Sequence, residues 1–326
     1  MPHRRIQVSS WVDRLLFAGS LILLSSAAEA QLVRYVASTG NDANPCTSPS
    51  APCRTLQRGI NSAPAGGEVK LLSSVDGDAT IDHSLTISGG SFTVAGSIVV
   101  NNASATVVLR DLNLFGAGTH DMGVYVTAAS SVHIVRCTVE RFTEDGILSV
   151  APNSELVVTD SAVRDNAVAG LMVYDESADS NNFGSIKLSV DTSRFENNDG
   201  NGLFLVGAAA ATISRTVISG NDANGIATNY AAIAITDTIA SGSPGAGYAL
   251  YQSKVTLGSS ISRGNGLGML ALTDDDPLVT ISNSVFVNNS EKGIFSADAP
   301  VLTRGNNTIA GNGIDIDGTL APLPGT

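Results

Sequence analysis

The side chains of this sequence that could most readily do chemistry are acids that recur just before short segments made of Gly and an apolar residue. Asp199 and Asp222 precede two such segments, and Glu144 with Asp145 precedes another. Neighbouring carboxylates can bind Ca²⁺ or share a proton as acid and base, so these four are the candidate catalytic residues. The alternative is turn chemistry, because Asp tolerates the left-handed backbone of tight loops. Further acids in this position are Asp121 and Glu291.

A second acidic group, Asp274 to Asp276, could hold a hard cation such as Ca²⁺. It lacks the spaced acidic pattern of a calcium loop, which favours a solvated loop instead. We therefore predict no metal site and no cofactor, with Ca²⁺ as the one ion left open. The net charge of −12 disfavours binding to phosphate backbones and so excludes a nucleic-acid partner.

Aromatic residues form a third set, suited to binding. Counted from each repeated Gly, odd positions of a strand should point inward and even positions outward. Spaced aromatic side chains on an outer face could stack on sugar rings, or a loop such as the polar stretch 175–185 could cover them. The even positions hold the candidate ligand-binding residues Tyr125, Tyr174, Phe204, Tyr251 and Phe295.

The first 30 residues have the pattern of an export signal. Arg4, Arg5 and Arg14 precede an apolar run of ten residues, Leu15–Leu24, and small residues follow up to Ala30. The run is shorter than the roughly 20 residues that span a bilayer. We therefore predict cleavage after Ala30 and a secreted or periplasmic protein with no membrane span.

In an oxidising compartment, cysteines can form disulfides. Cys46 and Cys53 enclose a short loop with two prolines, which keeps its ends close and makes a disulfide plausible. Two reduced structural thiols are the alternative. Cys137 is left over, and the repeat explains it.

The elements that must position these residues repeat along the chain. A Gly followed by an apolar residue recurs from Gly123 to Gly313 at steps of 20 to 25 residues, with one step of 32 that contains the stretch 175–185. Each unit has three short strand-like segments with period-two alternation. Such units describe coils of parallel β-structure that stack about 4.8 Å apart with right-handed crossovers.

A corner between the second and third strands of each unit supports this register, because Asp and Asn tolerate the required left-handed backbone. The predicted corner residues are Asp111, Arg136, Asp160, Asp191, Arg215, Asp237, Ser259, Asn283 and Asn306. The next residue is small and placed inside: Cys137, Ser161, Thr192, Thr216, Thr238, Ser260 or Ser284. Cys137 is therefore expected to be a buried thiol in place of Ser.

The N-terminal part differs from the repeats. Leu56 and Ile60 lie at i and i+4, which predicts a short amphipathic helix over Arg54–Ala63 that covers the open end of the sheets. The predicted organisation is an export signal at 1–30, a cap with the disulfide and the helix at 31–68, about ten coils at 69–318, and a tail at 319–326.

The segments NGLFLV, NGIAT, KGIFS and NGIDI, with strands such as VTISNS between them, resemble the right-handed parallel β-helix, or pectin-lyase-like, superfamily. Residues 35–57 resemble the start of secreted bacterial β-helix proteins. The resemblance implies an all-β solenoid, and the expected partner is a polysaccharide or cell-surface glycan. Only one segment, Thr80-Ile81-Asp82-His83, partly matches a catalytic motif of the family, and we interpret it as a strand edge and turn.

Two functions are consistent with these features. The favoured one is a binding protein that presents the first-strand face to a polysaccharide or surface partner without the known pectate-lyase catalytic set. The alternative is a polysaccharide lyase or glycoside hydrolase that uses the carboxylates before the first strand.

Overall fold

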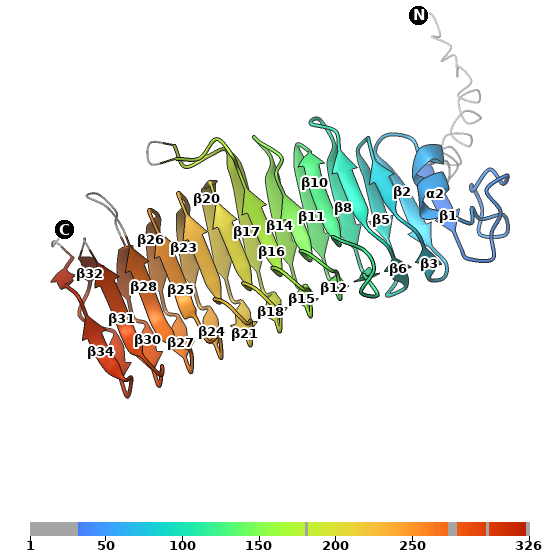
Figure 1. Ribbon diagram of the computed structural model, residues 1–326. Coiled ribbons are helices and arrows are strands. Elements are labelled where there is room, and N and C mark those ends of the chain that lie inside the picture. The colour runs from blue at the N-terminus through green and yellow to red at the C-terminus, as the bar shows by residue number, and fades with distance from the viewer. Residues whose placement is uncertain (1–31, 180–181, 273–278, 298–299, 324–326) are drawn as a thin grey trace, which may run out of the picture.

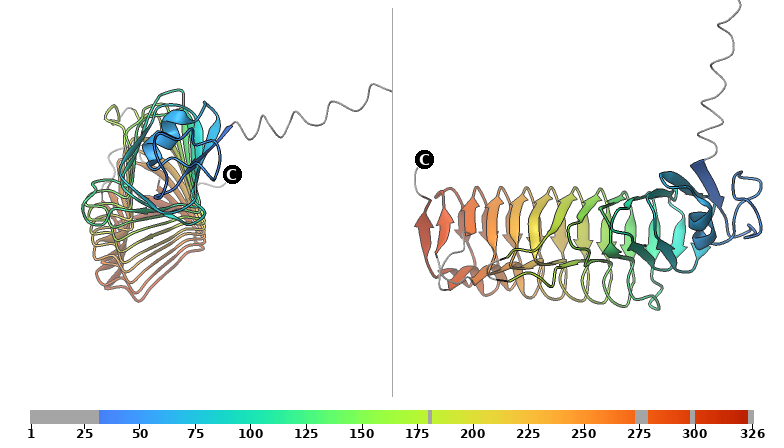
Figure 2. Two further views of the ribbon diagram at one scale, coloured as in Figure 1. Left: turned by 90° about the vertical axis from the view of Figure 1, so that its right-hand side faces the viewer. Right: turned by 90° about the horizontal axis from the view of Figure 1, so that it is seen from above.

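The chain winds into one elongated solenoid, with the N- and C-terminal segments at opposite ends (Figure 1). A computed structural model describes residues 32–179, 182–272, 279–297 and 300–323. Each turn of the chain adds one strand to each of three sheets, and neighbouring strands within a sheet are parallel (Figure 2). The predicted all-β parallel solenoid of about ten coils is thus confirmed.

Sheet A has thirteen strands. They are β1 (Val33–Val36), β2 (Gly67–Leu71), β5 (Leu85–Ser88), β8 (Thr106–Arg110), β11 (Ser131–Val135), β14 (Glu155–Thr159), β17 (Ile186–Asp191), β20 (Ala208–Ser214), β23 (Ala232–Thr236), β26 (Lys254–Gly258), β29 (Val279–Ser282), β32 (Val301–Thr303) and β35 (Leu320–Pro322).

Sheet B has eleven short strands, each following a corner after sheet A. They are β3 (Val75–Asp76), β6 (Thr93–Ala95), β9 (Asn113–Phe115), β12 (Thr138–Glu140), β15 (Ala162–Arg164), β18 (Arg194–Glu196), β21 (Val217–Ser219), β24 (Ile239–Ser241), β27 (Ile261–Arg263), β30 (Val285–Val287) and β33 (Thr308–Ala310).

Sheet C has eleven strands, most of which begin just after the repeated Gly of the unit. They are β4 (Ala79–Ile81), β7 (Ile98–Asn101), β10 (Val124–Ala128), β13 (Ile147–Ser149), β16 (Leu171–Tyr174), β19 (Leu203–Val206), β22 (Ile226–Asn229), β25 (Ala246–Tyr251), β28 (Leu267–Leu272), β31 (Lys292–Ala297) and β34 (Ile314–Asp317).

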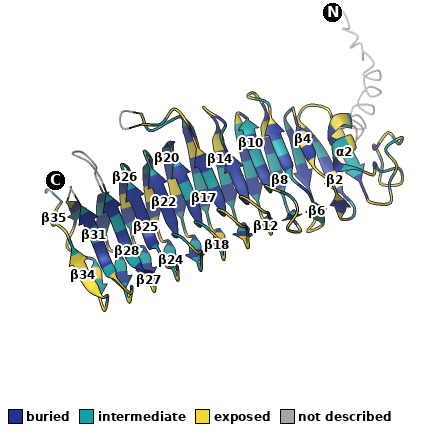
Figure 3. Cartoon of the chain, viewed as in Figure 1, coloured by how far each residue is buried: buried dark blue, intermediate teal, exposed yellow. Residues whose placement is uncertain are grey.

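The interior is filled by the alternate residues of all three sheets. Val124 and Val126 of β10 are almost fully buried, whereas Tyr125 between them faces outward. One continuous apolar core runs from Val36 to Val301 (Figure 3). Because each coil buries its apolar face only against the next, the stack and not the single coil is the stable unit.

The corners follow the prediction with two corrections. Left-handed backbone occurs at Asp111, Arg136, Asp160, Arg215, Asp237, Ser259 and Asn283. In the coil between Asp160 and Arg215, the corner is Thr192 (φ 48°), and Asp191 is the last residue of β17, paired with Ser214. The inward-facing small residue is therefore Ser193 and not Thr192. In the last described coil, Gly305 (φ 74°) takes the left-handed backbone in place of Asn306.

The small residues after the corners form an internal hydrogen-bonded ladder. The backbone N–H of Cys137 donates to Ser161 Oγ at 3.1 Å, and that of Ser161 donates to Ser193 Oγ at 3.2 Å. Cys137 is buried as predicted, and this burial raises the pKa of its thiol to about 11. Its side chain fills the place of a serine hydroxyl in the ladder, which is a structural role.

A second ladder was not foreseen. Buried asparagines lie in the turns between sheets B and C, one in most coils, and their amides bond to one another in two runs, Asn166–Asn198–Asn221 and Asn265–Asn289. They are Asn166, Asn198, Asn221, Asn265 and Asn289, with Ser243 in place of one asparagine. The amides satisfy the backbone N–H groups of sharp turns that no strand pairing reaches.

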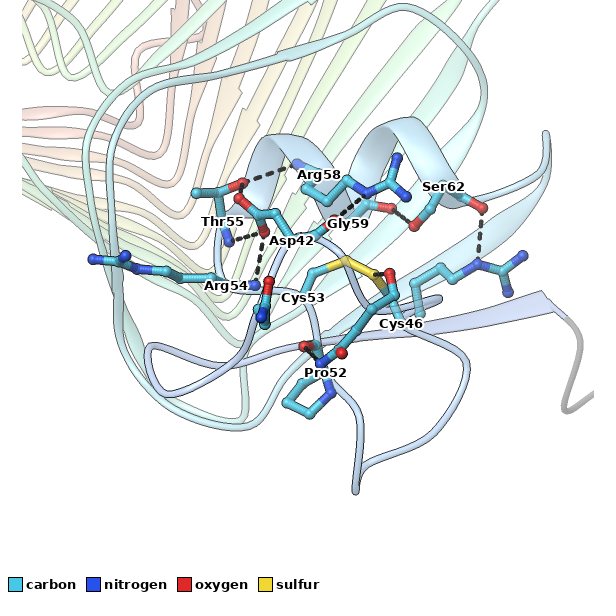
Figure 4. Close-up of a disulfide and its surroundings, with 12 residues drawn as sticks. Asp42, Cys46, Pro52, Cys53, Arg54, Thr55, Arg58, Gly59 and Ser62 are labelled. Atoms are coloured by element: carbon cyan, nitrogen blue, oxygen red, sulfur yellow. Dashed lines mark hydrogen bonds between the residues drawn. A yellow bond between two sulfur atoms is a disulfide. The ribbon is translucent and has the colours of Figure 1, made fainter.

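The N-terminal end is closed by helix α2 (Leu56–Ser62), which confirms the predicted capping helix (Figure 4). Asp42 accepts hydrogen bonds from the backbone N–H groups of Arg54 and Thr55, at 2.8 and 2.9 Å, and Thr55 caps the helix. A Cβ on Gly59 would lie 2.4 Å from Val36 Cγ2, so Gly lets the helix approach β1 this closely.

The disulfide between Cys46 and Cys53 is present and closes the loop beside this helix (Figure 4). The predicted export signal at 1–30 lies outside the described residues. Within those residues, no helix has the length and apolar character needed to cross a membrane. The boundaries at 68 and 318 stay predictions, although β35 extends the pairing of sheet A to Pro322.

Candidate ligand-binding face

The outer face of sheet C carries two columns of mainly apolar side chains, which we call the ring face. The first column is Tyr125, Leu148, Met172, Phe204, Ala227, Ala249, Leu270 and Phe295. The second column is Tyr174, Val206, Asn229, Tyr251, Leu272 and Ala297. All five predicted ligand-binding residues belong to the ring face.

Exposure varies along the ring face. Tyr174 is 42% exposed, whereas Leu148 is only 9% exposed, and Tyr125, Phe204, Tyr251 and Phe295 are half-buried. Strand pairing places Tyr125 three strands from Phe204 in one column. At about 4.8 Å per strand, those rings are about 14 Å apart along the solenoid axis. The face is therefore an extended array and not a single pocket.

An apolar cluster separate from the main core lies in the middle of the ring face. Ala227, Ala246 and Ala249 are buried there, and Phe204, Tyr251, Leu267 and Leu270 pack against them. These side chains cover one another on the outside of the sheet, so the outer surface of β19 to β28 is itself apolar. An apolar outer surface of this kind is typical of a binding surface.

The candidate carboxylates fall into two groups beside this face. Asp199 and Asp222 occupy equivalent positions on adjacent coils, because their backbone N–H groups donate to Asn166 O and Asn198 O, both at 2.9 Å. Both side chains are exposed, and their backbones are about one strand spacing, 4.8 Å, apart. The structure therefore brings these two together, as the sequence predicted.

Glu144 and Asp145 lie further toward the N-terminus. Val168 N donates to Glu144 O at 3.1 Å, so Val168 lies one coil after Glu144. Val168 in turn stacks on Gly200, which follows Asp199 in the next coil. Ala223 N donates to Gly200 O at 2.9 Å, one coil further on. Glu144 is thus two coils from the coil that holds Asp199, and the four acids do not form one cluster.

Asp145 differs from the other three because its side chain is buried. Burial raises the pKa of its carboxyl, the hydrogen bond from Ala169 N lowers it, and the neighbouring Glu144 raises it again, so the pKa lies above the ordinary value. Asp145 Oδ1 accepts from Ala169 N at 2.9 Å, as Asn224 Oδ1 accepts from Ala246 N at 2.8 Å. Asp145 therefore holds the turn where other coils use asparagine.

Metal-binding geometry is absent from the described part of the chain, where no three or more His, Cys, Asp or Glu side chains come together. Asp274 to Asp276, the acids considered for Ca²⁺, lie outside the described residues. Asp82 Oδ1 lies 2.7 Å from His83 Nδ1 just after β4, at the strand edge predicted for this motif.

A hollow of about 450 Å³ lies on another face, over the outside of sheet A. Its lining includes Ala210, Ala232, Ala234, Lys254, Thr256 and Thr280. Phe183, from the long loop after β16, lies over Lys254 with 5.3 Å between Nζ and the ring centre. The alanine-rich segments 208–211 and 231–234 were the only sequence signal for this hollow, and none of the predicted site residues lines it.

Comparison with known proteins identifies the fold independently. The right-handed β-helix region model matches residues 73–187 and 178–321. None of the curated proteins searched matches the sequence.

Three solved structures are similar over most of the chain. Pectate lyase Pel9A has a TM-score of 0.59 at 14% identity, covering 88% of this chain and 78% of that one. The A-module of the Azotobacter vinelandii mannuronan C-5 epimerase AlgE4 has a TM-score of 0.57 at 15% identity, covering 79% and 91%. A rhamnogalacturonan lyase has a TM-score of 0.53 at 11% identity, covering 86% and 87%. Identities this low show a shared fold alone.

Proposed function

Because this chain belongs to the right-handed β-helix family of the pectin-lyase-like superfamily, we propose that it binds a polysaccharide along the ring face. The observation that carries this proposal is the apolar outer surface of sheet C, with its own cluster around Ala227 and Ala249. Proteins of the same fold include two lyases and an epimerase named for polysaccharides. A linear polymer suits a face that repeats along an axis.

The physical basis is burial of apolar surface. A sugar ring has C–H faces that pack against aromatic and aliphatic side chains, and such contact gains roughly 25 cal/mol per Å² of apolar surface removed from water. Tyr174, with 42% of its surface exposed, and the half-buried Phe204 and Tyr251 have area left to bury. Rigid strands hold these rings in place, which limits the entropy lost on binding.

The proposed location of the protein is outside the cytoplasm, secreted or periplasmic. The disulfide between Cys46 and Cys53 supports this part of the proposal, because such bonds persist in oxidising compartments. The pattern of the first 30 residues supports it as well. Polysaccharides of cell walls and surfaces are found in the same compartments.

The test is native electrophoresis of the exported protein through gels that contain soluble polysaccharides. We expect retardation by at least one polysaccharide, and a loss of about tenfold in affinity for the double variant Phe204→Ala, Tyr251→Ala. The matched control is Val157→Ala, which removes an outward apolar side chain from β14 of sheet A. Equal retardation of the double variant and the wild type would refute the proposal.

A second candidate function is catalysis by Asp199 and Asp222. Their equivalent positions on adjacent coils favour it, because paired carboxylates can act as acid and base. A lyase would release unsaturated sugars that absorb ultraviolet light, and a hydrolase would release reducing ends. The absence of both products across a broad polysaccharide panel, with and without Ca²⁺, would exclude this candidate.

A further inference from the structure

The charges around the ring face are mostly negative. Acids occupy the loops that enter the strands of sheet C along most of its length: Asp121, Glu144, Asp199, Asp222 and Glu291. Asp199 lies in the loop that enters β19, and Asp222 in the loop that enters β22. These two strands carry Phe204 and Ala227, so the acids border the apolar cluster.

Most positive groups near the same loops have a partner, and Arg141, in the loop that enters β13, lies 5.8 Å from the ring centre of Phe115. Lys292 Nζ lies 2.6 Å from Asp317 Oδ2 and 3.8 Å from the ring centre of Phe295. His120 Nδ1 lies 2.9 Å from Asp78 Oδ1. On the outer face of sheet B, Arg164 pairs with Glu140 and Arg194 with Glu196, and Arg263 ends β27 there.

The apolar cluster offers a sugar ring the half-buried side chains that surround its alanines. In the first column, Ala227 and Ala249 lie between Phe204 and Leu270 on four consecutive strands. Phe204 and Leu270 are therefore about 14 Å apart, and together with Tyr251 and Leu267 they pack over the buried Ala227 and Ala249. Asn229 and Tyr251 flank the two alanines in the second column and can offer an amide and a hydroxyl.

We propose that the ring face selects an uncharged polysaccharide, with sugar rings against Phe204, Tyr251 and Leu270 and the acids repelling polyuronates. This inference rests on the proposed function and goes beyond it by naming the substrate class. A polyuronate carries a carboxylate on every sugar, so its charges would meet the row of acids along the whole face. Of the basic side chains described there, Lys292 and His120 have acidic partners and Arg141 lies over the Phe115 ring, so the acids outnumber the cations that could compensate this repulsion.

The repulsion has a signature in its dependence on salt. Exposed charges more than about 10 Å apart are largely screened at 0.1 M salt, so the effect is greatest at low ionic strength. Stacking of a neutral sugar on apolar side chains involves no charge and should not change with salt. The salt dependence of binding therefore distinguishes a neutral polysaccharide from a polyuronate.

The experiment compares neutral galactomannan and xyloglucan with polygalacturonate in affinity gels at 20 mM and 500 mM NaCl. We expect at least one neutral polymer to retard the protein equally at both salt concentrations, and polygalacturonate to cause no retardation at 20 mM. In Asp199→Asn, Asp222→Asn, polygalacturonate affinity should rise about tenfold at low salt. Leu270→Ala should weaken neutral binding about tenfold, and Val157→Ala on the outside of sheet A is its control.

The outcomes separate this inference from the function on which it rests. Retardation by polygalacturonate and not by the neutral polymers, with or without 1 mM Ca²⁺, would overturn the inference and leave polysaccharide binding intact. Unchanged polygalacturonate affinity in the double variant would overturn the role of Asp199 and Asp222. If neither these polymers nor any other polysaccharide tested retards the protein, both proposals are overturned.

Discussion

Asn198 is the residue at which the stability of the solenoid can be tested most directly. It is fully buried in the turn between sheets B and C. Its Oδ1 accepts from the backbone N–H of Asn166 at 3.2 Å and from the Asn166 side-chain amide at 2.9 Å. Its own amide donates to Asn221 Oδ1 at 2.9 Å. Asn198→Ala removes all three contacts at once, together with the longer hydrogen bond from the same amide to Val163 O at 3.4 Å.

The expected loss follows from the groups that remain. The variant leaves the Asn166 backbone N–H and one side-chain N–H without an acceptor in a site that water does not reach. Each buried donor left unsatisfied costs about 1–3 kcal/mol, so we expect a loss of about 3–4 kcal/mol. The shortened side chain also leaves a void in the stack, which makes the loss larger and not smaller.

Asn201→Ala is the matched control for this prediction. Asn201 Oδ1 also accepts from a backbone N–H and an amide, those of Asn224, at 3.2 and 2.9 Å. Asn201 is half-buried, so water can replace the lost acceptor and the loss should be about 1 kcal/mol.

The measurement is urea unfolding followed by circular dichroism, with the free energies compared at equal slope m. The two variants should differ by at least about 2 kcal/mol. Equal losses would refute the argument that burial makes the asparagine ladder important.

The remaining predictions concern the N-terminal loop and Asp145. Cys46→Ser should lower the free energy of unfolding by about 2–3 kcal/mol, because the disulfide closes a short loop in the unfolded chain. Reductant should lower the wild-type urea midpoint and leave the variant unchanged, and a wild type insensitive to reductant would contradict this. Asp145→Asn should stabilise the protein at pH 7, because Asn keeps the acceptor for Ala169 N and removes a buried charge. Since the folded-state pKa of Asp145 is raised, the cost of its charge exists above that pKa and disappears as protonation proceeds. The gain should therefore shrink as the pH falls toward the ordinary value of 3.8, and a gain that grows in acid would exclude this account.

The coil architecture was predictable because its signal repeats. A Gly and an apolar residue at intervals of 20 to 25 residues, with period-two alternation, left parallel stacking as the arrangement that buries every unit. The one-residue error at Asp191 shows the limit of this reasoning. Charge pattern aligned Asp191 with Asp160, whereas β17 extends through Asp191 and the corner falls on Thr192. The length of a strand depends on its pairing with both neighbours, which the local pattern does not contain.

The candidate site was predictable to a different degree. Alternation placed Tyr125 and Phe204 on the outer side of their strands, and repeat spacing placed Asp199 beside Asp222. The burial of Asp145 could not be predicted, because Glu144 and Asp145 are adjacent acids in one loop, and only the stacking of Ala169 above separates a buried side chain from an exposed one.

The sequence by itself determined which residues recur once per coil, because identical units that stack in parallel must place equivalent positions in one column. Only the tertiary structure decided how exposed each member of a column is, since that depends on the coil before and the coil after. Tyr174 and Leu148 have the same outward orientation, yet 42% of one and 9% of the other remain exposed to solvent. Alternation within a strand is a local property of the backbone, whereas burial is a property of three coils together.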